Sequence, residues 1–217
     1  MHNFENIKIH YITHKSDKYK PHELAEAACK AGIKCIQLRM KNSGDEDIIA
    51  EGHKIREICN KYNAIFILND KLELADIVKA DGVHLGKEDM NIRQAREIAG
   101  KKMIIGATAN TFQDILNAYN NSADYIGLGP FRETFTKEKL SPVLGADGLK
   151  NIIDKCNKNN IKIPVYAIGG IKKENIRDLS ETGISGVALS SAITDAGNPI
   201  EEGIDIMKEL DIYFNKQ

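Results

Sequence analysis

The sequence AIFILND at residues 64–70 is followed at residues 81–86 by DGVHLG, and these two stretches decide the fold. Each contains a short apolar run rich in β-branched residues, which is typical of a buried strand. The segment 72–79 between them has the pattern of a short helix. A strand, a helix and a second strand in this order predict two parallel neighbours, because parallel strands need a crossover connection.

The same alternation extends from this unit to both ends of the chain. The predicted strands are 7–13, 34–40, 64–70, 82–86, 103–108, 125–129, 164–170 and 186–190. Amphipathic segments separate them, at 22–31, 45–62, 92–99, 112–119, 148–157 and 173–182. Eight units in 217 residues favour a closed barrel, and no G-x-G-x-x-G follows the first strand, as a dinucleotide-binding fold would require. We therefore predict an α/β fold, a single (β/α)8 TIM barrel, with residues 1–217 forming one domain.

The composition argues against several classes of protein. Lys and Arg total 30 against 31 Asp and Glu, a formal charge of −1, so no overall basic field attracts nucleic acid. No apolar run reaches membrane-spanning length, and MHNFENIKIHYIT at the start lacks the apolar region of a signal peptide. Cys29, Cys35, Cys59 and Cys156 show neither a CxxC pair nor zinc-ligand spacing, which indicates reduced thiols. We expect a cytoplasmic protein without nucleic-acid or membrane partners; a homo-oligomer is compatible with the sequence.

One connection is far longer than the others. Residues 130–147 read PFRETFTKEKLSPVLGAD, whereas a usual βα loop has about 2–6 residues. Loops of this length in compact domains are usually lids or binding loops. Thr134, Thr136 and Lys137 offer hydroxyls and an ammonium that suit phosphate binding and closure over a substrate. A solvated loop has a similar composition, so this string alone does not decide between the two.

The second predicted strand ends in polar side chains that share one face. Gln37, Arg39 and Lys41 alternate with Leu38 and Met40 along the strand. The outer face of a barrel strand is covered by helices, where two cations would be costly to bury. The sequence therefore favours an anion-binding position for the three polar side chains at the open mouth of the barrel.

Carboxylates follow each of the next two strands. Asn69 and Asp70 come after the third strand, and Glu88 and Asp89 come after the fourth. Asp70 could cap the following helix or bind Mg2+, and within the second loop Asp89 is the better metal candidate. His84 is expected to be a packed strand residue. Because the two loops are neighbours in a barrel, Asp70 and Asp89 predict a Mg2+ site that binds phosphate oxygens.

The remaining strand ends predict a second anion site. Thr108 could offer its hydroxyl to a ligand, and Thr111 could cap the next helix. Gly169, Gly170, Ser190 and Ser191 follow the last two strands, where barrels often bind a phosphate through backbone N–H groups. Glycine lets the backbone approach such a ligand closely. A mouth with two anion zones suits one substrate carrying a diphosphate and a second carrying a monophosphate.

The set of strand ends resembles the thiamine phosphate synthase family. The motifs that carry the resemblance are QLRMK (37–41), FILND (66–70), DGVHLGKED (81–89), IGATANT (105–111), YIGLGPF (125–131), TFTK (134–137), AIGGI (167–171) and SSAI (190–193). They occur in order and cover nearly the whole chain. The resemblance implies condensation of a pyrimidine diphosphate with a thiazole phosphate, with Mg2+ as cofactor and diphosphate as leaving group. The carboxylated thiazole, whose use would add loss of CO2, stays open.

Residue roles are implied by this resemblance. The pyrimidine diphosphate would contact Gln37, Leu38, Arg39, Met40, Lys41, Asn69, Thr108 and Lys137. The thiazole phosphate would contact Thr134, Phe135, Thr136, Gly169, Gly170, Ser190 and Ser191. Asp70 and Asp89 would hold Mg2+, while Arg39, Lys41 and Lys137 would act in catalysis by neutralising the leaving diphosphate.

The chain departs from the family pattern at a few positions. Many members carry Ser at position 108 and His at position 110, where this chain has Thr108 and Asn110, and Arg132 and Glu133 replace a Pro-Thr neighbourhood. Two alternatives remain: a thiazole tautomerase on the same barrel, and a non-catalytic binder of phosphate ligands. Such tautomerases usually lack the diphosphate and metal residues that are present here, so the synthase is favoured.

Overall fold

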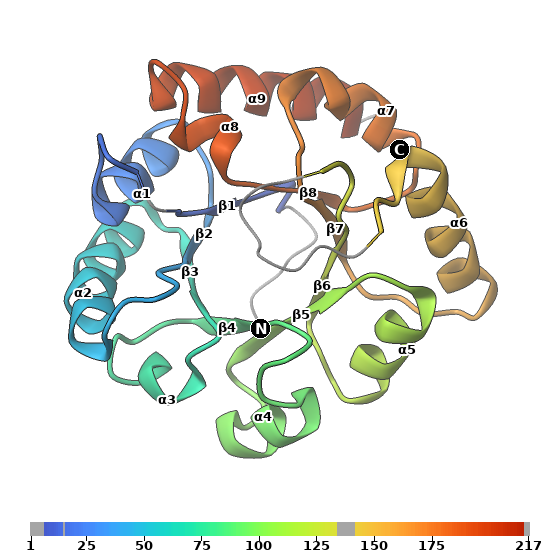
Figure 1. Cartoon of the computed structure of the whole chain (residues 1–217), viewed down its shortest axis with the longest axis horizontal. Helices are drawn as coiled ribbons and strands as arrows, with labels where there is room; N and C mark the ends of the chain where they lie inside the picture. The colour runs from blue at the N-terminus through green and yellow to red at the C-terminus, as the bar shows by residue number, and fades with distance from the viewer. Residues whose placement is uncertain (1–6, 15, 134–141, 215–217) are drawn as a thin grey trace.

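The strands form the predicted barrel. The computed structural model describes residues 7–14, 16–133 and 142–214. In this part of the chain eight parallel strands pair in sequence order and close between β1 and β8 (Figure 1). The strands are β1 Ile9–Ile12, β2 Cys35–Leu38, β3 Ile65–Asn69, β4 Gly82–Leu85, β5 Ile104–Ala109, β6 Tyr125–Leu128, β7 Val165–Ile168 and β8 Gly186–Leu189. The TIM-barrel prediction is confirmed.

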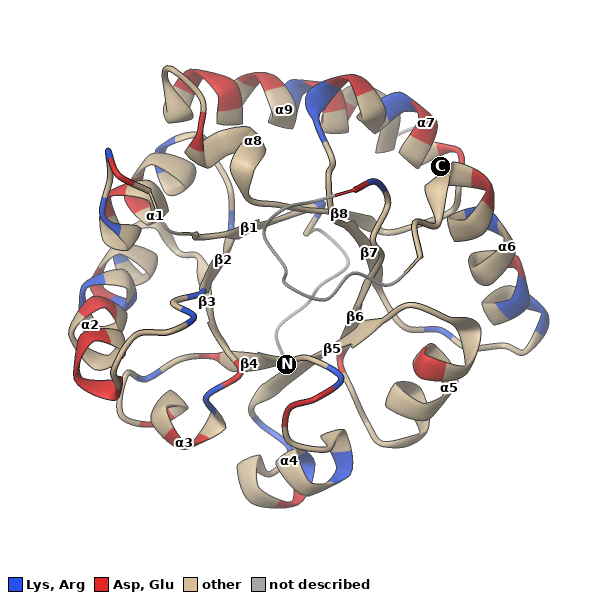
Figure 2. Cartoon of the chain, in the orientation of Figure 1, with Lys and Arg blue, Asp and Glu red and all other residues tan. Residues whose placement is uncertain are grey.

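Helices form a ring around the strands (Figure 1). They are α1 Pro21–Lys30, α2 Asp45–Tyr62, α3 Leu72–Ala75, α4 Ile92–Ala99, α5 Phe112–Asn120, α6 Gly145–Lys158, α7 Ile176–Ser180, α8 Ser191–Thr194 and α9 Pro199–Phe214. The segment predicted as a helix at 173–182 divides into a 3-10 turn at Lys173–Asn175 and the short α7. The outer helices α2, α6 and α9 carry acidic and basic residues side by side (Figure 2), in keeping with the balanced charge.

Apolar side chains pack in two layers. Inward-facing residues such as Ile12, Ile67 and Tyr166 fill the barrel, and a larger cluster lies between the strands and the helices. The four cysteines are buried free thiols, three on helices and one on β2, as predicted. Within the described ranges, no helix has both the length and the apolar character needed to cross a bilayer.

Two aspartates join neighbouring strands at the end of the barrel where β4 and β6 begin. Asp81 precedes β4, accepts a hydrogen bond from the backbone N–H of Phe66 at 2.7 Å and pairs with Arg56 of α2 at 2.8 Å. Asp124 precedes β6 and makes the same pair of contacts with Ile105 N–H and Arg96 of α4, at 2.7 and 2.6 Å. Each carboxylate therefore connects two strands and a helix through charge-assisted hydrogen bonds.

Replacing Asp81 with Ala is expected to lower the free energy of unfolding by about 2 kcal/mol, because it removes the acceptor of the Phe66 N–H and the carboxylate partner of the half-buried Arg56 guanidinium. For a chain of this size the melting temperature should fall by roughly 4–8 °C. Thermal denaturation followed by circular dichroism measures the shift. Asp154→Ala on the exposed face of α6 is the control and should leave the melting temperature unchanged. Equal melting temperatures for the two variants would show that the Asp81 contacts do not stabilise the fold.

Candidate active site

The end of β2 separates its side chains between two environments, as predicted. Gln37 is 2% exposed, in the barrel interior, where its side chain hydrogen-bonds Tyr125. Leu38 belongs to the outer apolar cluster, and Met40 packs partly buried against that cluster. The alternation thus places Gln37 toward the barrel axis and Leu38 and Met40 toward the helices.

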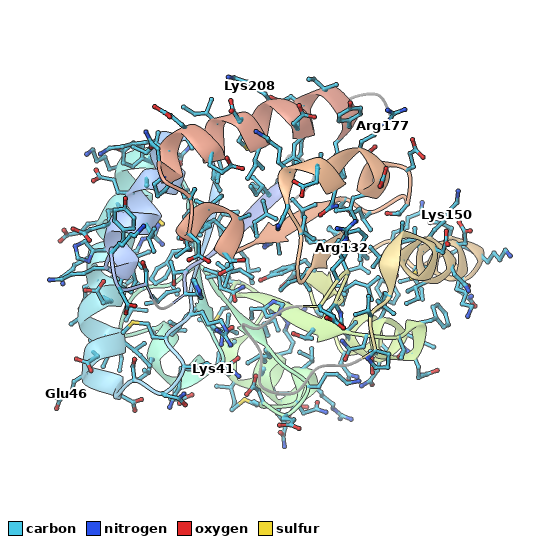
Figure 3. All side chains as sticks on the ribbon, turned by 45° about the horizontal axis from the view of Figure 1, so that its top comes forward. Lys41, Glu46, Arg132, Lys150, Arg177 and Lys208 are labelled. Atoms are coloured by element: carbon cyan, nitrogen blue, oxygen red, sulfur yellow. The ribbon has the colours of Figure 1, made fainter. Side chains whose placement is uncertain are left out.

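Arg39 and Lys41 bring two cations to the mouth. Burial lowers the pKa of the half-buried Arg39 guanidinium, while Asp70 acts in the opposite direction; arginine nevertheless stays charged. Lys41 Nζ lies 3.9 Å from Asp70 Oδ2 and its side chain is 57% exposed, so the pair is too loose and too solvated to fix either group. Figure 3 shows Lys41 inside the ring of helices, whereas Glu46, Lys150 and Lys208 lie on its outside. Lys41 is therefore accessible to an anionic ligand, and Arg39 acts on the same Asp70 carboxyl.

Asp70 and Asp89 are neighbours across the ends of β3 and β4. Burial and the hydrogen-bonded Asp89 carboxyl raise the pKa of Asp70 to about 6, although Lys41 and Arg39 oppose the shift. Asp70 has a left-handed backbone, with φ of 64°, and α3 begins after Lys71, so the cap alternative is not observed. Asp89 Oδ2 accepts the Gly86 N–H at 2.6 Å, which fixes its direction. Two adjacent carboxyl groups, one of which raises the pKa of the other, form a suitable place for a cation.

The chemistry of this pair fits Mg2+ better than a metal enclosed by protein ligands. Within the described residues, no group of three or more His, Cys, Asp or Glu side chains gathers at one point. Mg2+ is commonly held by one or two carboxylates, with waters and substrate phosphates completing its shell. Zinc sites, in contrast, usually take three or four protein ligands.

Substituting Asp70 with Asn should make the metal-free protein more stable at neutral pH. The pKa of Asp70 is raised from 3.8 to about 6 in the folded protein, so the native state binds this proton more tightly than the unfolded chain does. Its contribution to stability is therefore present at low pH and is lost as the pH rises from about 4 to above 6. The free energy of unfolding of Asp70→Asn should exceed that of the unchanged protein by a margin that grows across this pH window to about 1–2 kcal/mol. Asn also tolerates the left-handed backbone at this position.

Urea titrations of both proteins in EDTA at pH 4.5, 6 and 8 measure this difference. A stability difference that does not change with pH would show that the Asp70 carboxyl carries no raised pKa. Asp47→Asn, at an exposed position in the first turn of α2, controls for the loss of one negative charge.

The end of β5 supplies Thr108 and the N-terminus of α5. The Thr108 hydroxyl lies 3.0 Å from His84 Nε2, and His84 Nδ1 lies 3.1 Å from the Tyr125 hydroxyl. His84 is 7% exposed, which confirms the prediction of a packed strand residue. Thr111 caps α5 by accepting the Asp114 N–H at 3.1 Å, as predicted. Thr108 therefore remains the β5 candidate for ligand binding.

The ends of β7 and β8 form the second candidate zone. Gly169 and Gly170 have φ of 95° and 65°, a backbone that favours glycine, and a Cβ on Gly170 would lie 2.6 Å from the Glu133 carbonyl oxygen. The Ser190 Oγ is buried and has no hydrogen-bond partner among the described residues. A hydroxyl buried in this way is costly unless a ligand satisfies it. Ser191, which begins α8, is exposed.

The long loop brings Arg132 to this zone, a cation for which the sequence predicted no binding role. The Arg132 N–H donates to the Gly169 carbonyl at 3.0 Å, and the guanidinium lies over the Phe131 ring. Figure 3 shows Arg132 inside the ring of helices. Thr134, Phe135, Thr136 and Lys137 lie outside the described residues, so their assignments stay predictions.

A cavity of about 340 Å3 opens beside the carboxylate pair. It is lined by Leu38, Met40, Lys41, Asn69 and Asp70, together with Asn42, Ser43, Ile48, Leu68 and Lys71. Five positions assigned from the sequence to ligand or metal thus share one cavity. Arg39, Asp89 and Ser190 do not line this cavity, nor do the two glycines.

Comparison with known proteins identifies relatives of this barrel. Residues 9–193 match the family model described as thiamine monophosphate synthase. The chain is 45% identical to the thiamine-phosphate synthase of Phocaeicola vulgatus, over 94% of this chain and 98% of that protein. It is 49% identical to the thiamine-phosphate synthase of Flavobacterium johnsoniae, over 87% and 89%. The solved structure of thiamine phosphate pyrophosphorylase from Pyrococcus furiosus superposes with a TM-score of 0.87 at 34% identity, covering 97% and 99% of the two chains.

Proposed function

This chain belongs to the thiamine monophosphate synthase family, and we propose from that membership and from the barrel mouth how it acts. It is a thiamine-phosphate synthase, a transferase of alkyl or aryl groups. It condenses 4-amino-2-methyl-5-hydroxymethylpyrimidine diphosphate with 4-methyl-5-(2-hydroxyethyl)thiazole phosphate. The products are thiamine phosphate and diphosphate. We place the reaction in the cytoplasm, where the buried reduced thiols are stable.

The observation that carries this proposal is the carboxylate pair with two cations beside it. Asp70 and Asp89 are adjacent, and the positive charges of Arg39 and Lys41 act on the same carboxyl. A diphosphate with a divalent cation needs groups of both signs within reach, because the metal takes carboxylates and the outer phosphate oxygens take Arg or Lys. A site for an uncharged ligand would need neither.

The reaction begins with departure of the diphosphate. The bond between the pyrimidine methylene carbon and the diphosphate oxygen breaks, and the electron pair leaves with the oxygen. Arg39 and Lys41 neutralise the charge that grows there, the kind of preorganised stabilisation that often dominates catalysis. Mg2+ held by Asp70 and Asp89 would supply further neutralisation of the diphosphate. Lys137 joins this set as a prediction from the sequence.

Carbon–nitrogen bond formation completes the reaction. The thiazole ring nitrogen donates its electron pair to the cationic methylene carbon, giving the thiazolium of thiamine phosphate. Gly169, Gly170 and the buried Ser190 hydroxyl hold the phosphate of the thiazole. Asn69 and Gln37 bind the pyrimidine, with Thr108 closing the site from β5. Because bond breaking and bond making need close approach, the two substrates must be bound together.

The decisive assay supplies the pyrimidine diphosphate, the thiazole phosphate and Mg2+, and follows thiamine phosphate and released diphosphate, with EDTA as control. Metal-dependent formation of both products in equal amounts supports the proposal. Well-folded protein that forms neither product would refute it, and thiazole isomerisation would be assayed next. Binding of both substrates without turnover would favour the non-catalytic binder.

A further inference from the structure

Arg132 is held at the mouth of the barrel by backbone contacts with the end of β7. The Phe131 N–H donates to the Ile168 carbonyl at 2.8 Å, and the Arg132 N–H donates to the Gly169 carbonyl at 3.0 Å. These two hydrogen bonds extend the contact between the two chain segments past the ends of β6 and β7. The backbone of Arg132 is therefore placed by β7, beside the glycines of the second candidate zone.

Gly170 allows this close approach. A Cβ at this position would lie 2.9 Å from Arg132 Cβ and 2.6 Å from the Glu133 carbonyl oxygen, closer than real Cβ atoms come to other atoms. Gly106 of β5 leaves space in the same way inside the barrel, where a Cβ would collide with the ring of Tyr125. At Gly170, the neighbour that uses the space carries a positive charge.

The Arg132 guanidinium lies over the ring of Phe131, with Cζ 5.4 Å from the ring centroid. Phe131 is 3% exposed, so its ring belongs to a packed surface. A cation–π contact of this kind acts through the charge and does not use the N–H groups as hydrogen-bond donors. In the part of the chain that the structure describes, no carboxylate forms an ion pair with Arg132. The planar fork of N–H donors is therefore suited to bind the oxygens of an anion.

The neighbouring strand end supplies a second group that needs a ligand. β7 pairs with β8 through Ile168 and Ala188, so Gly170 and Ser190 follow adjacent strand ends. The Ser190 Oγ is buried and has no hydrogen-bond partner among the described residues. Because a hydroxyl donates one hydrogen bond and a guanidinium donates several, an anion with several oxygens can accept from both groups.

The position of Arg132 in the strand order separates it from the carboxylate pair. The strands follow one another from β1 to β8 around the barrel, so the end of β7 faces the end of β3 across the mouth. Asp70 follows β3, and Asp89 follows β4. The diphosphate with its metal is placed at those two ends, and the anion beside Arg132 is then the phosphate of the thiazole.

We propose that Arg132 binds the phosphate of the thiazole substrate and thereby makes this enzyme select the phosphorylated thiazole over the thiazole alcohol. The inference rests on the proposed function, which places that phosphate at Gly169, Gly170 and Ser190. Those residues offer backbone N–H groups and one hydroxyl, and Arg132 adds the positive charge that they lack. Charge-assisted hydrogen bonds are about twice as strong as neutral ones, so they distinguish a phosphate from an uncharged hydroxyl.

The phosphate contact can be measured without turnover. Isothermal titration calorimetry in Mg2+ compares thiamine phosphate, which keeps the phosphate of the thiazole, with thiamine, which lacks it. Arg132→Gln should weaken binding of thiamine phosphate about ten- to a hundredfold, the effect of one hydrogen-bonded charge, and change binding of thiamine less than about twofold. The Kd of Arg132→Lys for thiamine phosphate should lie between that of the unchanged protein and that of Arg132→Gln. Because a distorted loop would weaken both ligands, the difference between them reports the phosphate contact.

Steady-state kinetics test the same residue in the reaction. Arg132→Gln should raise the KM for the thiazole phosphate by a similar factor and leave the KM for the pyrimidine diphosphate unchanged. Arg177→Gln is the control: it removes an exposed arginine of α7 outside the ring of helices (Figure 3) and should bind and react like the unchanged protein.

The outcomes separate this proposal from the proposed function. Equal effects of Arg132→Gln on thiamine and thiamine phosphate, or a rise in the KM for the pyrimidine diphosphate instead, would overturn the role of Arg132. Protein that catalyses no condensation, but whose binding of thiamine phosphate depends on Arg132, would refute the synthase and retain the phosphate site. Failure of the unchanged protein to bind thiamine phosphate would overturn the site itself.

Discussion

Asp89→Asn should lower turnover about a hundred- to a thousandfold, the loss seen when one preorganised electrostatic group is removed from an active site. The substitution removes one of the two adjacent carboxylates and weakens the hold on Mg2+. The reduced kcat/KM should recover in part at high Mg2+, because mass action offsets weaker metal binding. The measurement is kcat/KM for the pyrimidine diphosphate across a Mg2+ titration.

Glu88→Gln is the matched control for this prediction. Glu88 is the neighbouring exposed carboxylate in the same loop, whereas Asp89 hydrogen-bonds Asp70. We expect Glu88→Gln to keep its activity within about twofold, as is usual for a surface substitution. A large loss in Glu88→Gln together with a small one in Asp89→Asn would assign the metal to Glu88. The melting temperature of Asp89→Asn should not fall, which separates loss of chemistry from loss of fold.

Arg39→Gln should lower kcat about a hundredfold, because Arg39 neutralises charge that grows on the leaving diphosphate. Arg39→Lys keeps the charge but loses the planar guanidinium that binds two phosphate oxygens. Its kcat should therefore lie between that of Arg39→Gln and that of the unchanged protein. Steady-state kinetics at saturating Mg2+ measure both variants. Arg93→Gln on α4, an exposed arginine 3.1 Å from Glu97, is the control. Activity of Arg39→Gln equal to that of the control would remove Arg39 from the reaction.

The fold could be predicted because its signal is local. Each predicted strand overlaps the observed one, since buried parallel strands are continuous apolar runs bounded by polar residues. The helix α9 was missed although its buried residues, Gly203, Ile206 and Leu210, recur at helical spacing. The segment 173–182 was predicted as one helix because its apolar positions do not distinguish an α-helix from a 3-10 turn followed by a shorter helix.

The site could be predicted only where it depends on strand order. Asp70 and Asp89 were expected to meet because the ends of neighbouring parallel strands lie at one edge of the sheet. The contacts of His84 with Tyr125 and Thr108 could not be predicted, because they depend on the register of three strands and on which side chains leave space inside the barrel. The position of Arg132 depends on the path of a long loop, for which the sequence offers no periodic signal.

The collision between a Cβ at position 106 and the ring of Tyr125 restricts the order in which mutations can accumulate as the sequence diverges. A side chain gained at position 106 while the tyrosine is still present overpacks the barrel, which is destabilising. Shortening position 125 first leaves a cavity, which a later, larger residue at 106 can fill. The two positions are therefore epistatic, and one order of the same two substitutions passes through a less stable intermediate than the other.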